Sequence, residues 1–183
     1  MQLAYGQGRS LGSGLAAART RGFTLLELMV TVAIVAILAT LAVPSFTAII
    51  NNNRLASQAN QLVASLQLAR SEAVRLNTAT TVCRSTDGTT CAAAGQWDRW
   101  ITIVAGSGQL LNDSSAKPPV QISSGVAAVT FRADGLARNA TGGLLANDIV
   151  VCVATTQPPQ NQRLVRMASG SRVSTEPASG ACP

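Results

Sequence analysis

The stretch GFTLLELMVTVAIVAILATLAVPSFTAII, residues 22–50, decides the fold of this chain. It carries one charged residue, Glu27, and from Leu28 to Ile50 it carries none. This uncharged run is longer than the roughly 20 apolar residues that a helix needs to cross a bilayer. The sequence therefore predicts a single membrane-spanning helix over residues 23–50, near the N-terminus.

The residues before this helix have the composition of a cytoplasmic leader. Residues 1–22 contain several arginines, no acid, and many Gly, Ser and Ala residues, as expected of a flexible basic segment on the cytoplasmic side. A secretory signal peptide would be cut after its apolar core, but the region Pro44–Ile50 continues apolar and has no Ala-x-Ala site. Gly22, in front of the core, is the better processing point.

The helix is expected to continue beyond the membrane, over residues 51–77. Pro44 removes one helical hydrogen bond and predicts a kink within the span. Beyond the span, apolar and small residues recur at alternating spacings of four and three, which indicates an amphipathic helix. These residues, which we call the apolar stripe, are Leu55, Ala59, Leu62, Leu66, Ala69, Ala73 and Leu76. A coiled-coil seam is an alternative, but the alanines and the length of only about three heptads favour packing against the chain's own sheet.

The composition changes to β-forming residues from Thr80 onward, after Asn77 and Thr78 end the helix. Asp87-Gly88 and Asp134-Gly135 are the clearest turns. The expected strands are Thr80–Arg84, Arg99–Ala105, Val120–Ser123, Ala128–Arg132, Asp148–Ala154 and Arg163–Ala168, with a short one around Arg172–Ser174. The predicted fold class is α+β, with a long N-terminal helix packed on an all-β antiparallel head that occupies residues 51–183, β-rich from residue 78.

These features carry a resemblance to a known family. The string Gly22-Phe23-Thr24-Leu25-Leu26-Glu27, followed by an apolar helix, resembles the class III signal of type IV pilins and type II secretion pseudopilins. The order of helix and head, with Gly95-Gln96-Trp97 ahead of a β run, resembles the GspH/FimT branch, the minor pilins and pseudopilins.

The resemblance implies processing and assembly. A prepilin peptidase is expected to cut between Gly22 and Phe23 and to N-methylate Phe23. The product would be an inner-membrane protein with one span and a periplasmic head. It would assemble with other pilin or pseudopilin subunits, near the tip of a type IV pilus or of a type II secretion pseudopilus. The machine, the position and the neighbouring subunits stay open.

Glu27 is the charged residue that this assembly is expected to use. A carboxylate within a membrane helix costs roughly 2.5–3.5 kcal/mol at the bilayer centre and less near the interface, so it usually has a partner. In the family the equivalent glutamate is thought to pair with the N-terminal amine of a neighbouring subunit. Glu27 would then set the register of a filament. The alternative is that Glu27 reaches the headgroups as a lone side chain.

Four cysteines, all in the head, are expected to form disulfides in an oxidising periplasm. Three connectivities are possible. We favour Cys83–Cys91, which closes a short loop around Asp87-Gly88, and Cys152–Cys182, which holds the C-terminal tail to a strand. Metal binding is the competing interpretation, but the chain has no histidine and no Cys-x-x-Cys motif.

Catalysis finds no support in this composition. Without histidine, a Ser-His or Cys-His relay cannot be built, and the eight acids are scattered along the chain. We therefore expect no enzymatic activity, no cofactor and no metal.

DNA uptake is an alternative function. The chain carries a net charge of +6, which falls to +3 without the three arginines of residues 1–22, because eleven basic residues then face eight acidic ones. Three tail arginines, Arg163, Arg166 and Arg172, could hold DNA by its phosphates. Some FimT-like proteins are thought to bind DNA through a Gly-Arg-x-Arg motif. This chain has Ser171-Arg172-Val173-Ser174 instead, with one arginine and with serine in the glycine position. Solvated arginines or partner contacts are therefore favoured over DNA binding.

Overall fold

The computed structural model describes residues 22–139 and 141–182. One helix, α1, runs from Leu25 to Arg75, and only β structure follows it in these ranges. The strands are β1 (Thr80–Arg84), β2 (Arg99–Val104), β3 (Leu110–Ser115), β4 (Val120–Ser124), β5 (Ala128–Phe131), β6 (Ala137–Arg138), β7 (Asn147–Val153), β8 (Gln162–Met167) and β9 (Val173–Ala178). This confirms the predicted α+β class.

The chain divides between Thr40 and Leu41 into two compact units. The second unit contains the rest of α1 and all the strands. Pro44 lies inside α1, whose helical assignment passes through that position. The expected kink at Pro44 stays a prediction.

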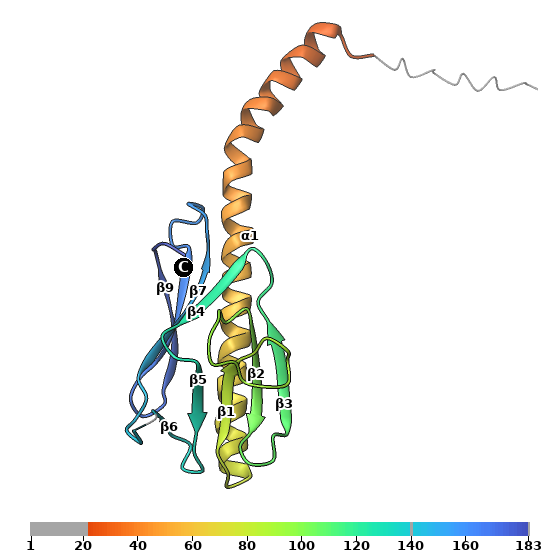
Figure 1. The fold of residues 1–183 in the computed structure, drawn as a ribbon. Helices are drawn as coiled ribbons and strands as arrows, with labels where there is room; N and C mark the ends of the chain where they lie inside the picture. The colour runs from red at the N-terminus through yellow and green to blue at the C-terminus, as the bar shows by residue number, and fades with distance from the viewer. Residues whose placement is uncertain (1–21, 140, 183) are drawn as a thin grey trace, which may run out of the picture. The chain divides into compact units, whose positions relative to one another are not determined.

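The strands form two antiparallel sheets along the C-terminal half of α1 (Figure 1). The first has the order β3-β2-β1-β5-β6 and the second the order β4-β7-β8-β9. The central pairing of the first sheet sets Cys83 opposite Ile101, and that of the second sets Val151 opposite Arg163. Asp134-Gly135 makes the tight turn between β5 and β6, where Gly135 has φ +73° and Val74 of α1 leaves little room for a side chain.

The apolar stripe packs on both sheets. Its members from Leu55 to Ala73 are at most 1% exposed and belong to one core cluster with Val82, Val129 and Ile149. Leu76 is only half-buried, because α1 ends at Arg75 and Asn77 then takes a left-handed conformation, with φ +49°. Packing against the chain's own sheets is thus confirmed, since these sheets cover the stripe that a coiled-coil partner would need.

Two strands were missed by the sequence prediction, β4 is one residue longer than predicted, and β9 is several residues longer. β3 lies at the edge of its sheet with the half-exposed sequence LLNDSS, so it shows no apolar alternation. β6 has only two residues. β9 extends to Ala178 despite Pro177, which an edge strand tolerates because one side of it makes no ladder hydrogen bonds.

Both tryptophans connect separate segments of the head through their indole N–H groups. Trp97 and Trp100 are fully buried. The indole N–H of Trp100 donates to Oγ of Ser65 on α1 at 2.9 Å, and that of Trp97 donates to the carbonyl of Val126 at 3.0 Å. Each ring therefore buries apolar area while its polar group stays satisfied.

Candidate functional site: the N-terminal segment and the head surface

Glu27 stands at the third helical position of α1, behind an N-cap. Oγ1 of Thr24 accepts a hydrogen bond from the backbone N–H of Glu27 at 3.1 Å, and the carbonyl of Thr24 accepts one from Leu28 at 3.1 Å. Thr-x-x-Glu is the sequence signature of a capping box. Thr24 was not among the residues predicted from the sequence, although this spacing would have identified it.

The carboxylate of Glu27 is exposed and accepts no hydrogen bond or ion pair within residues 22–139 and 141–182. A negative charge in the first turn of a helix is favourable, because the backbone N–H groups there are unpaired. Glu27 is thus compatible with its helix position while its side chain stays available to another group.

The helix around Glu27 exposes an apolar surface. Among the described residues, α1 is the one helix long and apolar enough to cross a membrane, with mean hydropathy 2.5 and none of its most apolar window buried. Thr31, Thr40 and Thr47 turn their hydroxyls back to carbonyls three or four residues earlier, at 2.7–3.1 Å. These bonds satisfy the hydroxyl donors without water, as an apolar environment requires.

Hydrogen bonds between the β-rich part of the head and α1 begin directly after the apolar run. Nδ2 of Asn51 donates to the carbonyl of Gln157 at 2.9 Å, in the connection between β7 and β8. Next to it, Asn52 accepts a hydrogen bond from the guanidinium of Arg163 on β8. These contacts begin at residue 51, where the sequence analysis placed the start of the head.

The structure does not gather the tail arginines into one patch. Arg163 and Arg166 stand three residues apart on β8, so they point to opposite faces of the sheet. Arg163 shares its face with the buried Val165 and turns toward α1. Alternation along the strand therefore separates two of the three arginines to which the DNA-binding alternative was assigned.

Arg166 is already neutralised. It pairs with Asp148 of β7 at 3.2 Å and with Glu176 of β9 at 3.1 Å. The hydrogen bond from Arg166 to Asp148, followed by the charges of both acids, raises the pKa of Arg166 above its ordinary value. Arg172 is exposed. DNA binding by these residues stays a prediction that the geometry does not favour.

Ser171 stands where the Gly-Arg-x-Arg motif has glycine, and its backbone conformation is one that glycine adopts easily. It is fully buried with φ +62°, in the turn between β8 and β9. Its Oγ accepts the backbone N–H of Ala137 at 2.6 Å, and its carbonyl accepts Nη1 of Arg70 at 3.2 Å. The serine hydroxyl therefore joins the second sheet to the end strand of the first, and the carbonyl joins it to α1.

The four cysteines pair as the sequence analysis favoured. Cys83 bonds to Cys91 with a Cα–Cα distance of 5.5 Å, and Cys152 bonds to Cys182 with one of 5.8 Å. Near Cys182, the amides of Asn161 and Gln162 donate to carbonyls of the tail at 2.9 Å. The disulfide and these amides together hold the tail against the second sheet.

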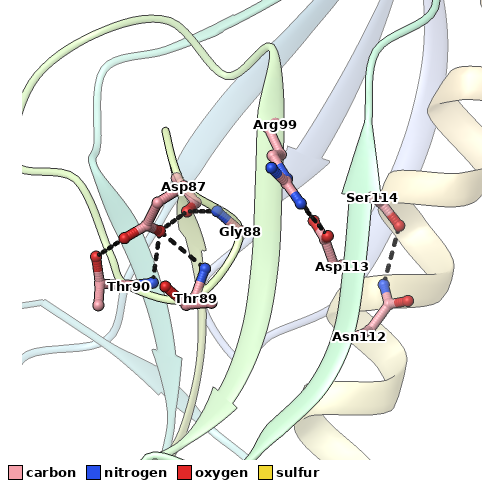
Figure 2. A network of polar contacts seen from close by, with 9 residues as sticks. Asp87, Gly88, Thr89, Thr90, Arg99, Asn112, Asp113 and Ser114 are labelled. Atoms are coloured by element: carbon pink, nitrogen blue, oxygen red, sulfur yellow. Dashed lines mark hydrogen bonds and ion pairs between the residues drawn. The ribbon is translucent and has the colours of Figure 1, made fainter.

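A polar network stabilises the loop that the first disulfide closes (Figure 2). Oδ1 of Asp87 accepts the backbone N–H groups of Thr89 and Thr90, each at 2.8 Å, and Oδ2 accepts the Thr90 hydroxyl at 2.7 Å. These bonds, the two backbone ones most, hold the pKa of Asp87 well below its ordinary range. This loop supports the predicted turn at Asp87-Gly88, where Gly88 has φ +78°.

Beside this loop, Arg99 of β2 lies against Asp113 of β3, as Figure 2 shows. Nε of Arg99 donates to Oδ1 of Asp113 at 2.8 Å, and this hydrogen bond is the main reason that the pKa of Asp113 is lowered. The pair fastens the edge strand on the outer face of the sheet. Within the described parts of the chain, no group of His, Cys, Asp and Glu side chains could hold a metal ion.

Comparison with known families decides what this architecture is. Residues 58–171 match the family described as Type II transport protein GspH, and residues 17–43 match the Prokaryotic N-terminal methylation motif. The chain belongs to the GspH family. GspH-family membership and the methylation motif together make it a minor pilin or pseudopilin, a structural subunit that assembles with other pilin-type subunits.

One solved structure of a minor pilin shows the same fold, and a solved pseudopilin is also similar. The type IV minor pilin FimU of Pseudomonas aeruginosa PAO1, in space group P21, is 24% identical and has a TM-score of 0.51, over 69% of this GspH-family chain and 90% of that one. The minor pseudopilin EpsH from the Type 2 Secretion System of Vibrio cholerae is 11% identical with a TM-score of 0.49, over 68% and 97%. No curated protein sequence matches the chain significantly.

Proposed function

We propose that this GspH-family subunit is cut between Gly22 and Phe23 by a prepilin peptidase, N-methylated at Phe23 and stored in the inner membrane with its head in the periplasm. From there it enters a type IV pilus or a type II secretion pseudopilus, near the tip. The observation that carries this proposal is Glu27: a carboxylate without a partner among the described residues, at the capped start of α1 and directly before the uncharged, exposed apolar run Leu28–Ile50.

The chemistry of Glu27 supports a role in assembly. Cleavage before Phe23 creates an amine four residues from the carboxylate, so each mature subunit carries one charge of each sign at the start of its helix. The Thr24 cap satisfies the N–H of Glu27 and leaves the carboxylate unused. An amine of a neighbouring subunit can neutralise it, and the apolar faces of the two helices then lie together.

Replacement of Glu27 tests the proposal. E27V removes the charge and keeps the helix apolar, so we expect normal membrane insertion but loss of most incorporation into filaments and of crosslinking to other subunits. T24V is the matched control, because it removes the cap at a cost of about 1 kcal/mol and keeps the carboxylate. Normal incorporation of E27V, or an equal defect in both variants, would contradict the role of Glu27.

The mass of the mature protein tests the processing step separately. Cleavage before Phe23 followed by methylation predicts a chain that begins at Phe23 and carries one extra methyl group. A mature chain that begins elsewhere would refute this site. G22A in the same host should block cleavage and leave the full-length chain in the membrane.

Deletion of the gene separates the two machines. Pilus formation and twitching, secretion of exoproteins and uptake of DNA would be scored side by side in the same strain. Loss of secretion alone assigns the subunit to a pseudopilus, and loss of pili assigns it to a type IV pilus. No change in any of these would refute an assembly role.

A further inference from the structure

A groove of about 470 Å³ opens on the head beside the end of the apolar run. It is lined by residues of α1 between Ile50 and Gln58, and by Lys117 and Pro118 of the connection between β3 and β4. We call it the juxtamembrane groove. All of its lining residues belong to the second compact unit, so the groove is a feature of the head itself.

The juxtamembrane groove has a basic lining without a counter-charge. Arg54 and Lys117 are its two charged residues, and both are exposed. Neither forms an ion pair in the part of the chain that the structure describes, whereas four other arginines of the head each pair with an acid. Two cations at one groove repel each other, and an anion between them removes that repulsion.

Among the described residues, no acid lines this groove. The carbonyl of Asp98 accepts the backbone N–H of Ala116 at 2.7 Å, but Asp98 borders a different hollow and forms no ion pair with Lys117. Lys117 also borders an adjoining hollow that contains Asp113, but Arg99 already binds that carboxylate. The remaining lining residues from Asn53 to Gln58 are polar and uncharged. Gln58 is almost fully buried, and its amide oxygen has no hydrogen-bond partner among the described residues. The groove thus combines two free cations with neutral hydrogen-bonding groups.

The position of the groove along α1 indicates which anion it meets. The uncharged run ends at Ile50, and Arg54 follows four residues later, about 6 Å along a helix. The headgroup layer on each side of a bilayer is roughly 5–7 Å thick. In the membrane-anchored state of the proposed function, on which this step rests, Arg54 therefore lies at the level of the lipid headgroups.

We propose that the juxtamembrane groove binds the headgroup of an anionic phospholipid. The lipid phosphate lies between Arg54 and Lys117, and the hydroxyls of a glycerol headgroup reach the amide of Asn53 and the hydroxyl of Ser57. Such a lipid would hold the head at the bilayer surface in a defined orientation before assembly. Removal of the subunit into a filament would exchange this anion for solvent or for another subunit.

The test uses the full chain in nanodiscs of phosphatidylcholine that contain a small fraction of a photoreactive phosphatidylglycerol. After illumination, mass spectrometry locates the crosslinked peptides. We expect labelling of residues 50–58 and 117–118, and a loss of about thirtyfold in R54Q/K117Q, since each basic residue near an anionic surface contributes about 1 kcal/mol. A photoreactive phosphatidylcholine should label the same peptides weakly in both proteins.

The matched control is R132Q/R172Q, which removes two exposed arginines elsewhere on the head. It should keep the labelling of the unmutated protein, and buried tryptophan fluorescence should be the same in all variants. Equal labelling by both lipids, or equal loss in both double variants, would overturn the proposal. Unchanged lipid labelling in R54Q/K117Q, together with lost crosslinking to another subunit, would also overturn the proposal. The groove would then hold an acidic side chain of that partner.

Membrane retention is measured first, by extraction with carbonate. If the unmutated chain stays in the membrane but both photoreactive lipids label it equally, only the lipid site is overturned. Extraction of that chain by carbonate overturns the proposed membrane anchoring, and with it this inference.

Discussion

Replacing Ser171 by alanine should destabilise the head by about 2 kcal/mol. The change deletes the hydroxyl that accepts the N–H of Ala137 at 2.6 Å. Ala137 is fully buried, so its N–H would lose its partner where water cannot replace it. An unsatisfied buried donor costs about 1–3 kcal/mol. Arg70 would still bond to the carbonyl of residue 171, and the backbone would keep its positive φ.

Glycine at the same position separates the hydrogen bond from the backbone strain. S171G loses the same acceptor, but it relieves a left-handed conformation that costs an L-residue about 1–2 kcal/mol. Part of this gain is offset, because glycine adds about 0.4–1 kcal/mol of conformational freedom to the unfolded chain. S171G should therefore be less destabilised than S171A, by roughly 0.5–1 kcal/mol.

Thermal unfolding of the full chain in detergent micelles measures both variants. The two tryptophans of the chain are fully buried, so their fluorescence reports the unfolding of the head. For a head of this size, 2 kcal/mol corresponds to a fall in Tm of roughly 6–10 °C. The control is S174A, the same substitution at a half-buried serine of β9 whose hydroxyl makes no hydrogen bond within the described residues. Equal Tm values for S171A and S174A would refute the reasoning.

Three further predictions concern the loop, the tail and DNA. Because the pKa of Asp87 is lower in the folded than in the unfolded chain, its carboxylate stabilises the fold fully above about pH 4, and this stabilisation is lost as the pH falls toward the folded-state pKa. D87N should therefore make Tm depend less on pH in the acid range. An unchanged dependence of Tm on pH in D87N would count against this. Replacing both Cys152 and Cys182 by serine should lower the free energy of unfolding by about 3.5 kcal/mol, and replacing both Cys83 and Cys91 by about 2.5 kcal/mol, because the chain-entropy model gives the larger effect to the separation of 30 residues than to that of 8. Denaturant unfolding measures both double variants, and a larger loss in the Cys83/Cys91 variant would contradict the prediction. The split faces of the tail arginines predict that the unmutated protein gives no salt-sensitive DNA mobility shift; a shift that replacement of all three by alanine abolishes would restore the DNA-receptor hypothesis.

Local pattern was enough to predict several elements. The apolar stripe follows a helical period, so its burial could be predicted from residues that lie within two turns of each other. β1 has the predicted bounds of Thr80–Arg84, and Asn77 ends the helix region as expected. Asp87-Gly88 and Asp134-Gly135 could be recognised as turns because glycine adopts positive φ without a steric penalty.

Long-range pairing explains what was missed. β3 is a strand because β2 offers it an open edge, although its own residues alternate poorly and stay half-exposed. The tail arginines looked like one cluster because they are close in sequence, yet the strand period separates Arg163 from Arg166. The acids that neutralise Arg166 come from β7 and β9, so no local pattern could have identified them.

The sequence by itself determined the uncharged run Leu28–Ile50, the carboxylate of Glu27 directly before it, the family signal around Gly22 and the stripe that α1 buries. Each of these depends on residues that are neighbours along the chain, and on the thickness of a bilayer or the pitch of a helix. Only the tertiary structure decided the two-sheet strand order, the structural use of Ser171 and the meeting of Arg54 with Lys117 at one groove. These depend on which distant segments compete best for burial and hydrogen bonds, a choice that is made when the head folds as a whole.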